Sequence, residues 1–183
     1  MASVITATTT SGLTQSADNS GVLQLASGTG NLVTVPSVTG TAMVSGNMPA
    51  FSAYNSTSQS VSSDTSAKIV FDSELFDTNS NFASNRFTPT VAGYYQVSCN
   101  AYWSNYNGGA FVILTLYKNG SSFKELARLN ATSATINGSA LVYLNGSTDY
   151  IEMYWYSASG TTTLFNNNGQ NLNGFSAVLV RGA

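Results

Sequence analysis

An alternation of apolar and polar side chains over Gly93–Trp103 constrains the fold more than any other feature of the sequence. One set of alternate residues is Tyr95, Val97, Cys99, Ala101 and Trp103, and the other is Tyr94, Gln96, Ser98, Asn100 and Tyr102. A period of two is that of a β-strand, whose successive side chains point to opposite faces of a sheet. The segment therefore predicts a long strand whose first set fills a core and whose second set faces outward.

The other apolar runs are also short, rich in β-branched and aromatic residues, and separated by turn residues. They predict further strands at Ala50–Tyr54, Ala67–Phe71, Phe111–Tyr117, Ala140–Leu144, Tyr150–Tyr156 and Phe175–Val180. Asn-Gly pairs begin at Asn119, Asn137 and Asn145, and such pairs favour tight turns because both residues accept positive φ. Only Ser122–Leu129 has a helix-like composition, without an apolar stripe. We expect an all-β jelly-roll β-sandwich of about eight to ten strands.

The first 48 residues differ from the rest of the chain. They contain no Trp, Tyr or Phe, and Asp18 is their only charged residue. Two apolar runs, Gly21–Leu25 and Asn31–Val35, flank the turn-like Ser27–Gly30 and suggest a weak hairpin. Because a segment with two short apolar runs and no aromatic residue buries little surface alone, we expect residues 1–48 to be an extended arm ordered by partners. A flexible leader is the alternative. Residues 49–183 should form the compact domain.

The chain lacks most of the side chains that carry catalysis. Charged residues make up only 8% of it, the six Lys and Arg are scattered, and the net charge is −2, which argues against nucleic-acid binding. No His is present, so the usual general base and the commonest metal ligand are missing. The single Cys99 cannot form an intrachain disulfide, and its strand register predicts a buried apolar role. We expect no catalytic residue, no cofactor and no metal, and therefore not an enzyme.

Three acidic residues, Asp72, Glu74 and Asp77, lie close together in sequence. Paired carboxylates serve glycosidases and several oxygens bind calcium, so a catalytic pair and a calcium site are the functional alternatives for this cluster. Solvated loop charges are the simpler interpretation. No run is long enough to cross a bilayer, and the N-terminus has no basic and apolar secretion signal. We expect synthesis in a cytoplasm without a signal peptide and no membrane partner.

One spaced pattern is more specific than composition. It reads Phe71-x5-Asp77-x4-Phe82-x4-Phe87-x5-Gly93-x-Tyr95. This pattern resembles the signature of C1q-like domains, relatives of the tumour necrosis factor fold. Pro49–Tyr54, Phe87–Tyr95, Phe111–Gly120 and Phe175–Val180 are similar to further strands of that family. The resemblance covers residues 49–183, although the spacing from Phe82 to Phe87 is two residues shorter than usual. It implies a jelly roll that forms a homotrimer about a threefold axis.

Outward tyrosines are more numerous than a solvated monomer needs. Tyrosine combines apolar area with a polar tip, which suits an interface. In Tyr150–Tyr156 the alternation places Ile151, Met153 and Trp155 inward and the tyrosines and Glu152 outward. With the implied trimer, we expect the interface to include Tyr94, Tyr102, Tyr150, Tyr154, Tyr156 and Val178. The alternative is an aromatic row covered by a loop of the same chain.

Two stretches of the leader, Leu13–Leu25 and Val38–Phe51, are similar to sequence segments in tail-fibre and virion structural proteins of bacteriophages. The leading hypothesis is a virion protein on the particle surface, a trimeric capsid decoration or cement knob held to other virion proteins by residues 1–48. A tail or head fibre tip that binds host surface glycans is the first alternative. A cellular carbohydrate-binding adhesin is the second, with Trp103 and Tyr106 available to stack on sugars.

Overall fold

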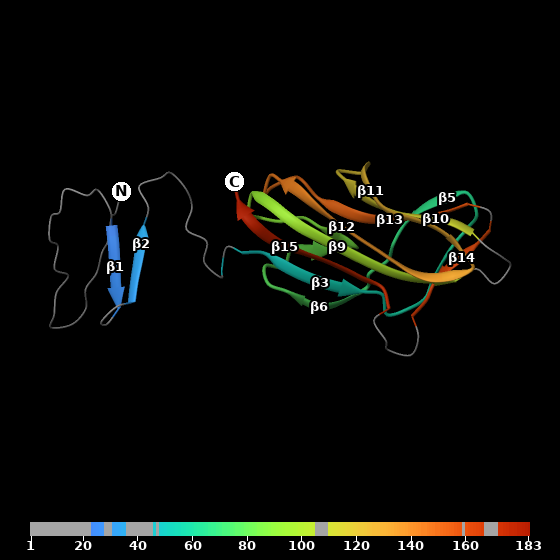
Figure 1. Cartoon of the computed structure of the whole chain (residues 1–183), viewed down its shortest axis with the longest axis horizontal. Helices are drawn as coiled ribbons and strands as arrows, with labels where there is room; N and C mark the ends of the chain where they lie inside the picture. Colours follow the sequence, from blue (N-terminus) through green and yellow to red (C-terminus); the bar gives the residue numbers. More distant parts are fainter. Residues whose placement is uncertain are drawn as a thin grey trace. The chain divides into compact units, whose positions relative to one another are not determined.

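The computed structural model describes residues 23–27, 31–35, 46, 48–104, 110–158, 160–166 and 172–183. Contacts divide the chain into two compact units, Met1–Thr41 and Ala42–Ala183. In the first unit β1 (Leu23–Ser27) and β2 (Asn31–Val35) pair antiparallel, with Leu23 opposite Val35 (Figure 1). This pairing confirms the expected hairpin, whose connecting residues 28–30 lie outside the described residues. The boundary between residues 48 and 49 stays a prediction.

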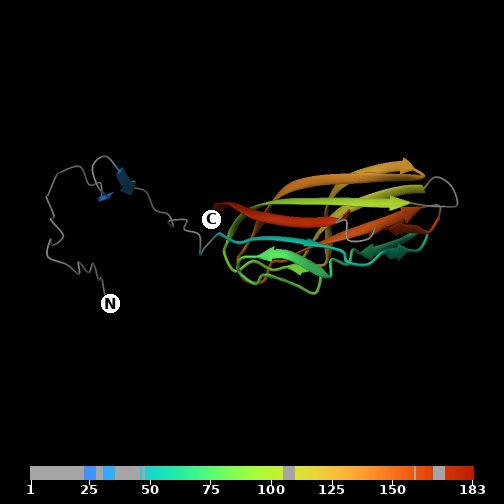
Figure 2. The same cartoon turned by 90° about the horizontal axis from the view of Figure 1, so that it is seen from below.

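Seven strands of the second unit form one antiparallel sheet, which we call the front sheet. Its main order is β12 (Ser133–Leu144), β9 (Gly93–Ser104), β15 (Gly174–Gly182), β3 (Ala50–Tyr54) and β6 (Ser73–Asp77). Two short strands complete the sheet. The first, β14 (Thr162–Leu164), pairs with Trp103 and Ser104 at the end of β9, and the second, β4 (Gln59–Val61), pairs with β14. Figures 1 and 2 show β9, β12 and β15 running side by side.

The second layer, which we call the back sheet, has six strands. Its order is β11 (Ser121–Ala131), β10 (Ala110–Lys118), β13 (Ile151–Ala158), β8 (Arg86–Phe87) and β7 (Phe82–Ala83), and β5 (Thr65–Lys68) also pairs with β13. The two sheets pack face to face around one apolar core. No helix of membrane-spanning length and hydropathy occurs in the part of the chain that the structure describes.

The predicted strands are present. Of the predicted Asn-Gly turns, Asn119-Gly120 lies in a turn, whereas Asn137-Gly138 lies within β12, paired with Asn100 and Cys99 of β9. Two predicted segments also differ. The strand expected at Ala67–Phe71 ends at Lys68, because the amides of Val70 and Phe71 donate instead to the side chains of Gln59 and Asn85. The segment with helix-like composition lies in β11, which pairs with β10 along its length. Sheet pairing outweighs local helix propensity at this position, as tertiary context commonly does.

The core confirms the alternation in Gly93–Trp103. Its five apolar residues are at most 3% exposed, and Ile151, Met153 and Trp155 of β13 are fully buried. The indole rings of Trp103 and Trp155 lie 6.0 Å apart and connect the two sheets. Glu152 points away from the core, as expected, but its side chain is covered rather than exposed to solvent. Lys68 and Arg86 cover it and neutralise its charge.

The spaced signature residues have structural roles. Phe82 and Phe87 stack on Phe51, with ring centroids 4.7 and 4.5 Å away, and Phe71, Phe82, Phe87 and Tyr95 are all buried. Asp77 accepts hydrogen bonds from the amides of Asn79 and Phe82 at 3.2 and 2.7 Å and so holds the turn between β6 and β7. A Cβ at Gly93 would lie 2.3 Å from the carbonyl oxygen of Arg181. The aromatic residues of the pattern are therefore core residues, while Asp77 holds a turn and Gly93 permits a close approach of two strands.

Candidate interaction surfaces

The outward side chains of β12, β9, β15 and β3 form transverse rows, which together we call the front face. From one end, the rows contain Tyr143 and Tyr94; Leu141, Gln96, Val178 and Ala50; Ser139, Ser98, Ser176 and Ser52; and Asn137, Asn100, Gly174 and Tyr54. None of these residues is charged. The face therefore changes from apolar and aromatic at one end to a row of serines and then of amides.

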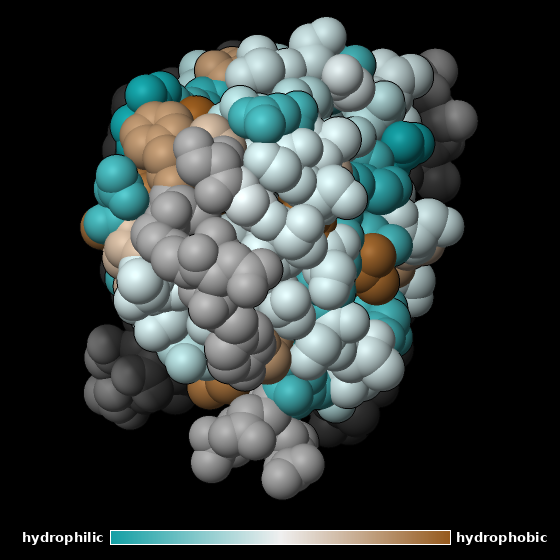
Figure 3. Space-filling model, turned by 90° about the vertical axis from the view of Figure 1, so that its right-hand side faces the viewer, coloured by the Kyte–Doolittle hydropathy of each residue, from teal (hydrophilic) through white to brown (hydrophobic). Residues whose placement is uncertain are grey.

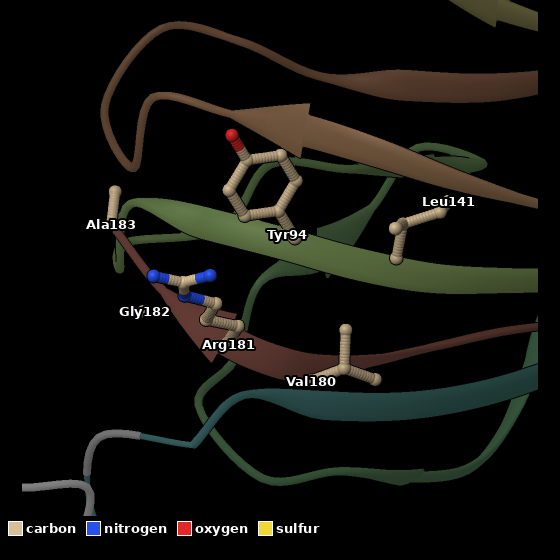
Figure 4. Close-up of a pocket in the computed structure, with 6 residues that line it drawn as sticks. All are labelled: Tyr94, Leu141, Val180, Arg181, Gly182 and Ala183. Atoms are coloured by element: carbon tan, nitrogen blue, oxygen red, sulfur yellow. The ribbon is translucent and has the colours of Figure 1, made fainter.

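Five exposed apolar residues gather at the first end of the front face, and we call them the front patch. They are Tyr94 (42% exposed), Leu141 (56%), Tyr143 (41%), Val178 (42%) and Val180 (54%). A shallow hollow of about 450 Å³ lies among Tyr94, Leu141, Val180 and the C-terminal residues Arg181 to Ala183 (Figure 4). Exposed apolar groups gathered in this way on a soluble domain are typical of an interaction site.

Charge is distributed unevenly between the two sheets. All four ion pairs found among the described residues join strands or turns of the back sheet. Charge on the front face lies at the end with the front patch, where Arg181 is opposite Tyr94 in the register and Lys118 Nζ lies 5.8 Å from the Tyr143 ring centroid. At the end of the sandwich shown in Figure 3, most of the surface has intermediate hydropathy, as a chain rich in Ser, Thr and Gly requires. The rest of the front face carries no charged residue in these rows and needs little desolvation when it is covered.

The outward side of the back sheet, which we call the back face, is aromatic and ionic. Tyr117 of β10 stacks on Tyr154 of β13, with centroids 3.8 Å apart and an interplanar angle of 20°. The Arg86 guanidinium lies 3.7 Å from the ring centroid of Tyr150. Burial raises the pKa of Tyr154, and the negative charge of Glu152 raises it further. The phenols here are thus packed against one another and against charges.

The six residues predicted for the trimer interface do not share one surface. Tyr94 and Val178 lie on the front face, and so does Tyr102, whose ring is 6.1 Å from that of Phe165. The other three, Tyr150, Tyr154 and Tyr156, lie on the back face. Alternation within each strand identified the outward sides, but it could not show that β9 and β13 belong to different sheets.

Sequence reasoning missed three residues of the front patch. Leu141 and Tyr143 lie in a strand whose two sets of alternate residues are both apolar at this end, so its sequence does not show which set faces outward. Val180 faces outward beside a bulge between Leu179 and Arg181 in the pairing of β15 with β9. The signal that could have found the first two is their pairing with β9, which places them beside Gln96 and Tyr94.

Neither the residues expected to stack on sugars nor the acidic cluster forms a binding site among the described residues. Trp103 is fully buried in the core and offers no ring to a sugar, and Tyr106 lies outside the described residues. Asp72 accepts hydrogen bonds from the amide and hydroxyl of Ser56, which lower its pKa against the opposing effect of burial. Asp77 holds the turn described above. Within the described ranges, no three His, Cys, Asp or Glu side chains gather closely enough to hold a metal ion.

Cys99 lies on the inward side of β9 and is 3% exposed. Burial raises the pKa of its thiol, which keeps it protonated near neutral pH. The thiolate is the nucleophilic form of cysteine, so the position supports the predicted role of a small apolar core residue.

No protein-family model matches the sequence, and neither does a curated protein. Solved structures do match. The globular domain of zebrafish complement 1qA protein is 19% identical, covers 74% of this chain and 99% of its own, and has a TM-score of 0.50. Crystal structures of murine APRIL at pH 8.5 and pH 8.0 are each 9% identical over 73% of this chain and 99% of theirs, with TM-scores of 0.51 and 0.52. The chain has a C1q/TNF-like jelly-roll fold.

At these identities the likeness concerns the fold alone. It confirms the predicted class of β-sandwich, and the signature residues now explain why so distant a sequence adopts it. The rings of Phe51, Phe82 and Phe87 stack in the core. Asp77 accepts a hydrogen bond from the amide of Phe82, and Gly93 leaves room for the backbone of Arg181. The C1q/TNF-like unit thus presents two chemically different outer faces.

Proposed function

We propose that the chain forms a homotrimer through its front face and acts as a structural or adhesive knob rather than as an enzyme. The observation that carries this proposal is a front face whose rows between Leu141 and Tyr54 contain no charged residue, with the front patch at one end. Charged residues are depleted at the centres of protein interfaces, while tyrosine is enriched there. The front patch contains two tyrosines and three aliphatic residues, 41 to 56% exposed.

A threefold assembly also needs two different surfaces that meet, because each subunit contacts one neighbour on each side. A second exposed apolar site lies on the other edge of the front sheet. Phe76 of β6 is 51% exposed and lies opposite Ser52 of β3, and Leu75 beside it is 60% exposed. The front patch of one subunit would meet the β6 edge of the next.

The mass of the protein in solution tests the trimer. Static light scattering of the wild type should give three times the 19.2 kDa of one chain. Val178→Asp places a charge in the front patch and should reduce the measured mass toward that of one chain. Phe123→Asp is the matched control, since Phe123 is similarly exposed (49%) but belongs to β11 of the back sheet. A wild type that runs as a monomer, or equal effects of both variants, would contradict the assignment.

We further propose that this knob is a bacteriophage virion protein, a capsid decoration or cement protein on the particle surface. The support comes from the leader, whose stretches Leu13–Leu25 and Val38–Phe51 are similar to virion protein sequences. The unit Met1–Thr41 contributes only the hairpin β1–β2 to the described residues, and an isolated hairpin is marginal in water. Residues 1–48 would therefore bind other virion proteins.

The number of copies on purified particles tests this role. Quantitative mass spectrometry should find hundreds of copies per particle for a decoration protein and a few dozen or fewer for a fibre tip. Absence from purified particles would reject both. The matching solved structures named above are zebrafish and murine proteins, which favours a cellular adhesin as the second candidate. Binding to host cells by the purified protein without any particle would support that alternative.

A further inference from the structure

We propose that the back face binds a saccharide through a carboxylate group, at a site formed by Arg86 and Lys68 beside Tyr150 and Tyr154. This inference is independent of the trimer, which uses the front face. It gives a role to Tyr150 and Tyr154, two of the three back-face tyrosines that the front-face interface does not include.

The site has one more positive than negative charge. A single oxygen, Oε1 of the buried Glu152, accepts hydrogen bonds from Arg86 Nε at 3.0 Å and from Lys68 Nζ at 3.3 Å. Both cations keep contact with solvent, since their side chains are 40% and 31% exposed. One carboxylate thus balances two cations, which leaves a unit of positive charge on a protein whose net charge is negative.

Donor groups remain available for a second anion. Arg86 uses only its Nε in the ion pair, and the described residues offer no acceptor to its Nη1 and Nη2 atoms. A guanidinium presents its donors in a planar fork that matches a carboxylate. Lys68 Nζ also donates to the Ser84 carbonyl oxygen at 3.1 Å, which fixes the ammonium beside the guanidinium. The cations are therefore held in place before any ligand arrives.

Aromatic rings surround these donors. The Arg86 guanidinium lies over the ring of Tyr150, 3.7 Å from its centroid, and Tyr154 lies opposite Lys68 in the pairing of β13 with β5. Tyr154 is held by its stack on Tyr117. Tyrosine supplies a rigid apolar ring with a polar tip, which suits a ligand that has both C–H faces and hydroxyl groups. A sugar ring has this chemistry, and one carboxylate per ring matches the single excess charge.

Paired glycans that differ only in charge test the proposal. The probes are tri-galacturonate with its methyl ester, and 3′-sialyllactose with lactose, titrated against the full chain by calorimetry. At least one carboxylated probe should bind ten-fold or more tightly than its neutral counterpart, and its affinity should fall as salt rises. No binding by either carboxylated probe, or equal binding by the neutral counterparts, would overturn the proposal.

Variants locate the site. Arg86→Gln and Lys68→Gln each leave one cation to pair with Glu152, so each should keep the fold and weaken carboxylate binding at least ten-fold. Arg128→Gln is a matched control, because Arg128 also pairs with a glutamate, Glu125, and lies over an aromatic ring, Phe111 at 4.8 Å. An equal loss with Arg128→Gln would overturn the site. If Arg86→Gln fails to fold, Lys68→Gln decides.

Discussion

Tyr94 of β9 and Tyr143 of β12 face each other across the strand pair, with ring centroids 5.5 Å apart and both rings exposed. Two tyrosines in contact on an open sheet face contribute little to the stability of one subunit, because water reaches both rings. In the proposed trimer, a neighbouring subunit would cover the same pair, which offers it apolar area with two polar tips. We therefore expect these two rings to matter for assembly rather than for the stability of one subunit.

Replacement of either ring should weaken the trimer more than the fold. We expect Tyr94→Ser and Tyr143→Ser each to raise the concentration at which the trimer dissociates ten-fold or more, as central aromatic residues do in interfaces. The free energy of unfolding of the separated subunit should change by less than about 1 kcal/mol, because both positions are exposed. Sedimentation equilibrium and urea titration measure the two quantities. A large stability loss with unchanged assembly would contradict this prediction.

Gly93 is required by a close backbone approach. A Cβ at this position would lie 2.3 Å from the carbonyl oxygen of Arg181 and 2.6 Å from the Leu179 side chain. Gly93→Ala should therefore separate β9 from the end of β15 and destabilise the fold by about 1–3 kcal/mol. Gly46→Ala is the control, since nothing lies within 4 Å of its Cβ position, and its urea midpoint should stay unchanged.

The buried carboxylate of Glu152 should matter more for stability than an exposed one. Glu152→Gln leaves Lys68 and Arg86 facing each other without an anion, at a cost of about 1–3 kcal/mol. The value is below that of a fully buried pair because both cations reach water. Glu125→Gln, which breaks the exposed pair with Arg128, should leave the urea midpoint unchanged. Equal effects of the two variants would mean that burial of Glu152 is not what makes its ion pairs matter.

Asp149 gives the fold a dependence on acid pH. Hydrogen bonds from Asn119 and Lys118 hold the pKa of its carboxyl below the ordinary value. A lowered pKa means that its contribution is complete above the unfolded value of about 3.9 and is lost as pH falls through the folded value. The stability difference between wild type and Asp149→Asn should be constant from pH 5 to 7 and shrink below about pH 4. Chemical unfolding across that range measures it, and a constant difference would contradict the prediction.

The sequence alone determined the strand at Gly93–Trp103 and its two sides, because side-chain alternation is a local property of extended backbone. It also identified the jelly roll, since Phe71, Phe82, Phe87 and Tyr95 are core positions and Asp77 and Gly93 are turn and close-approach positions. These features depend on residue type and short spacing, which a sequence shows directly.

Only the tertiary structure decided which outward sides belong together. Tyr94 and Val178 share a face because β15 pairs with β9, whereas Tyr154 lies on the opposite sheet because β13 pairs with β10. Glu152 is buried by Arg86 and Lys68, which lie 66 and 84 residues away along the chain. Alternation predicts that a side chain points away from the core, but the pairing of distant strands determines which residues lie beside it on the surface.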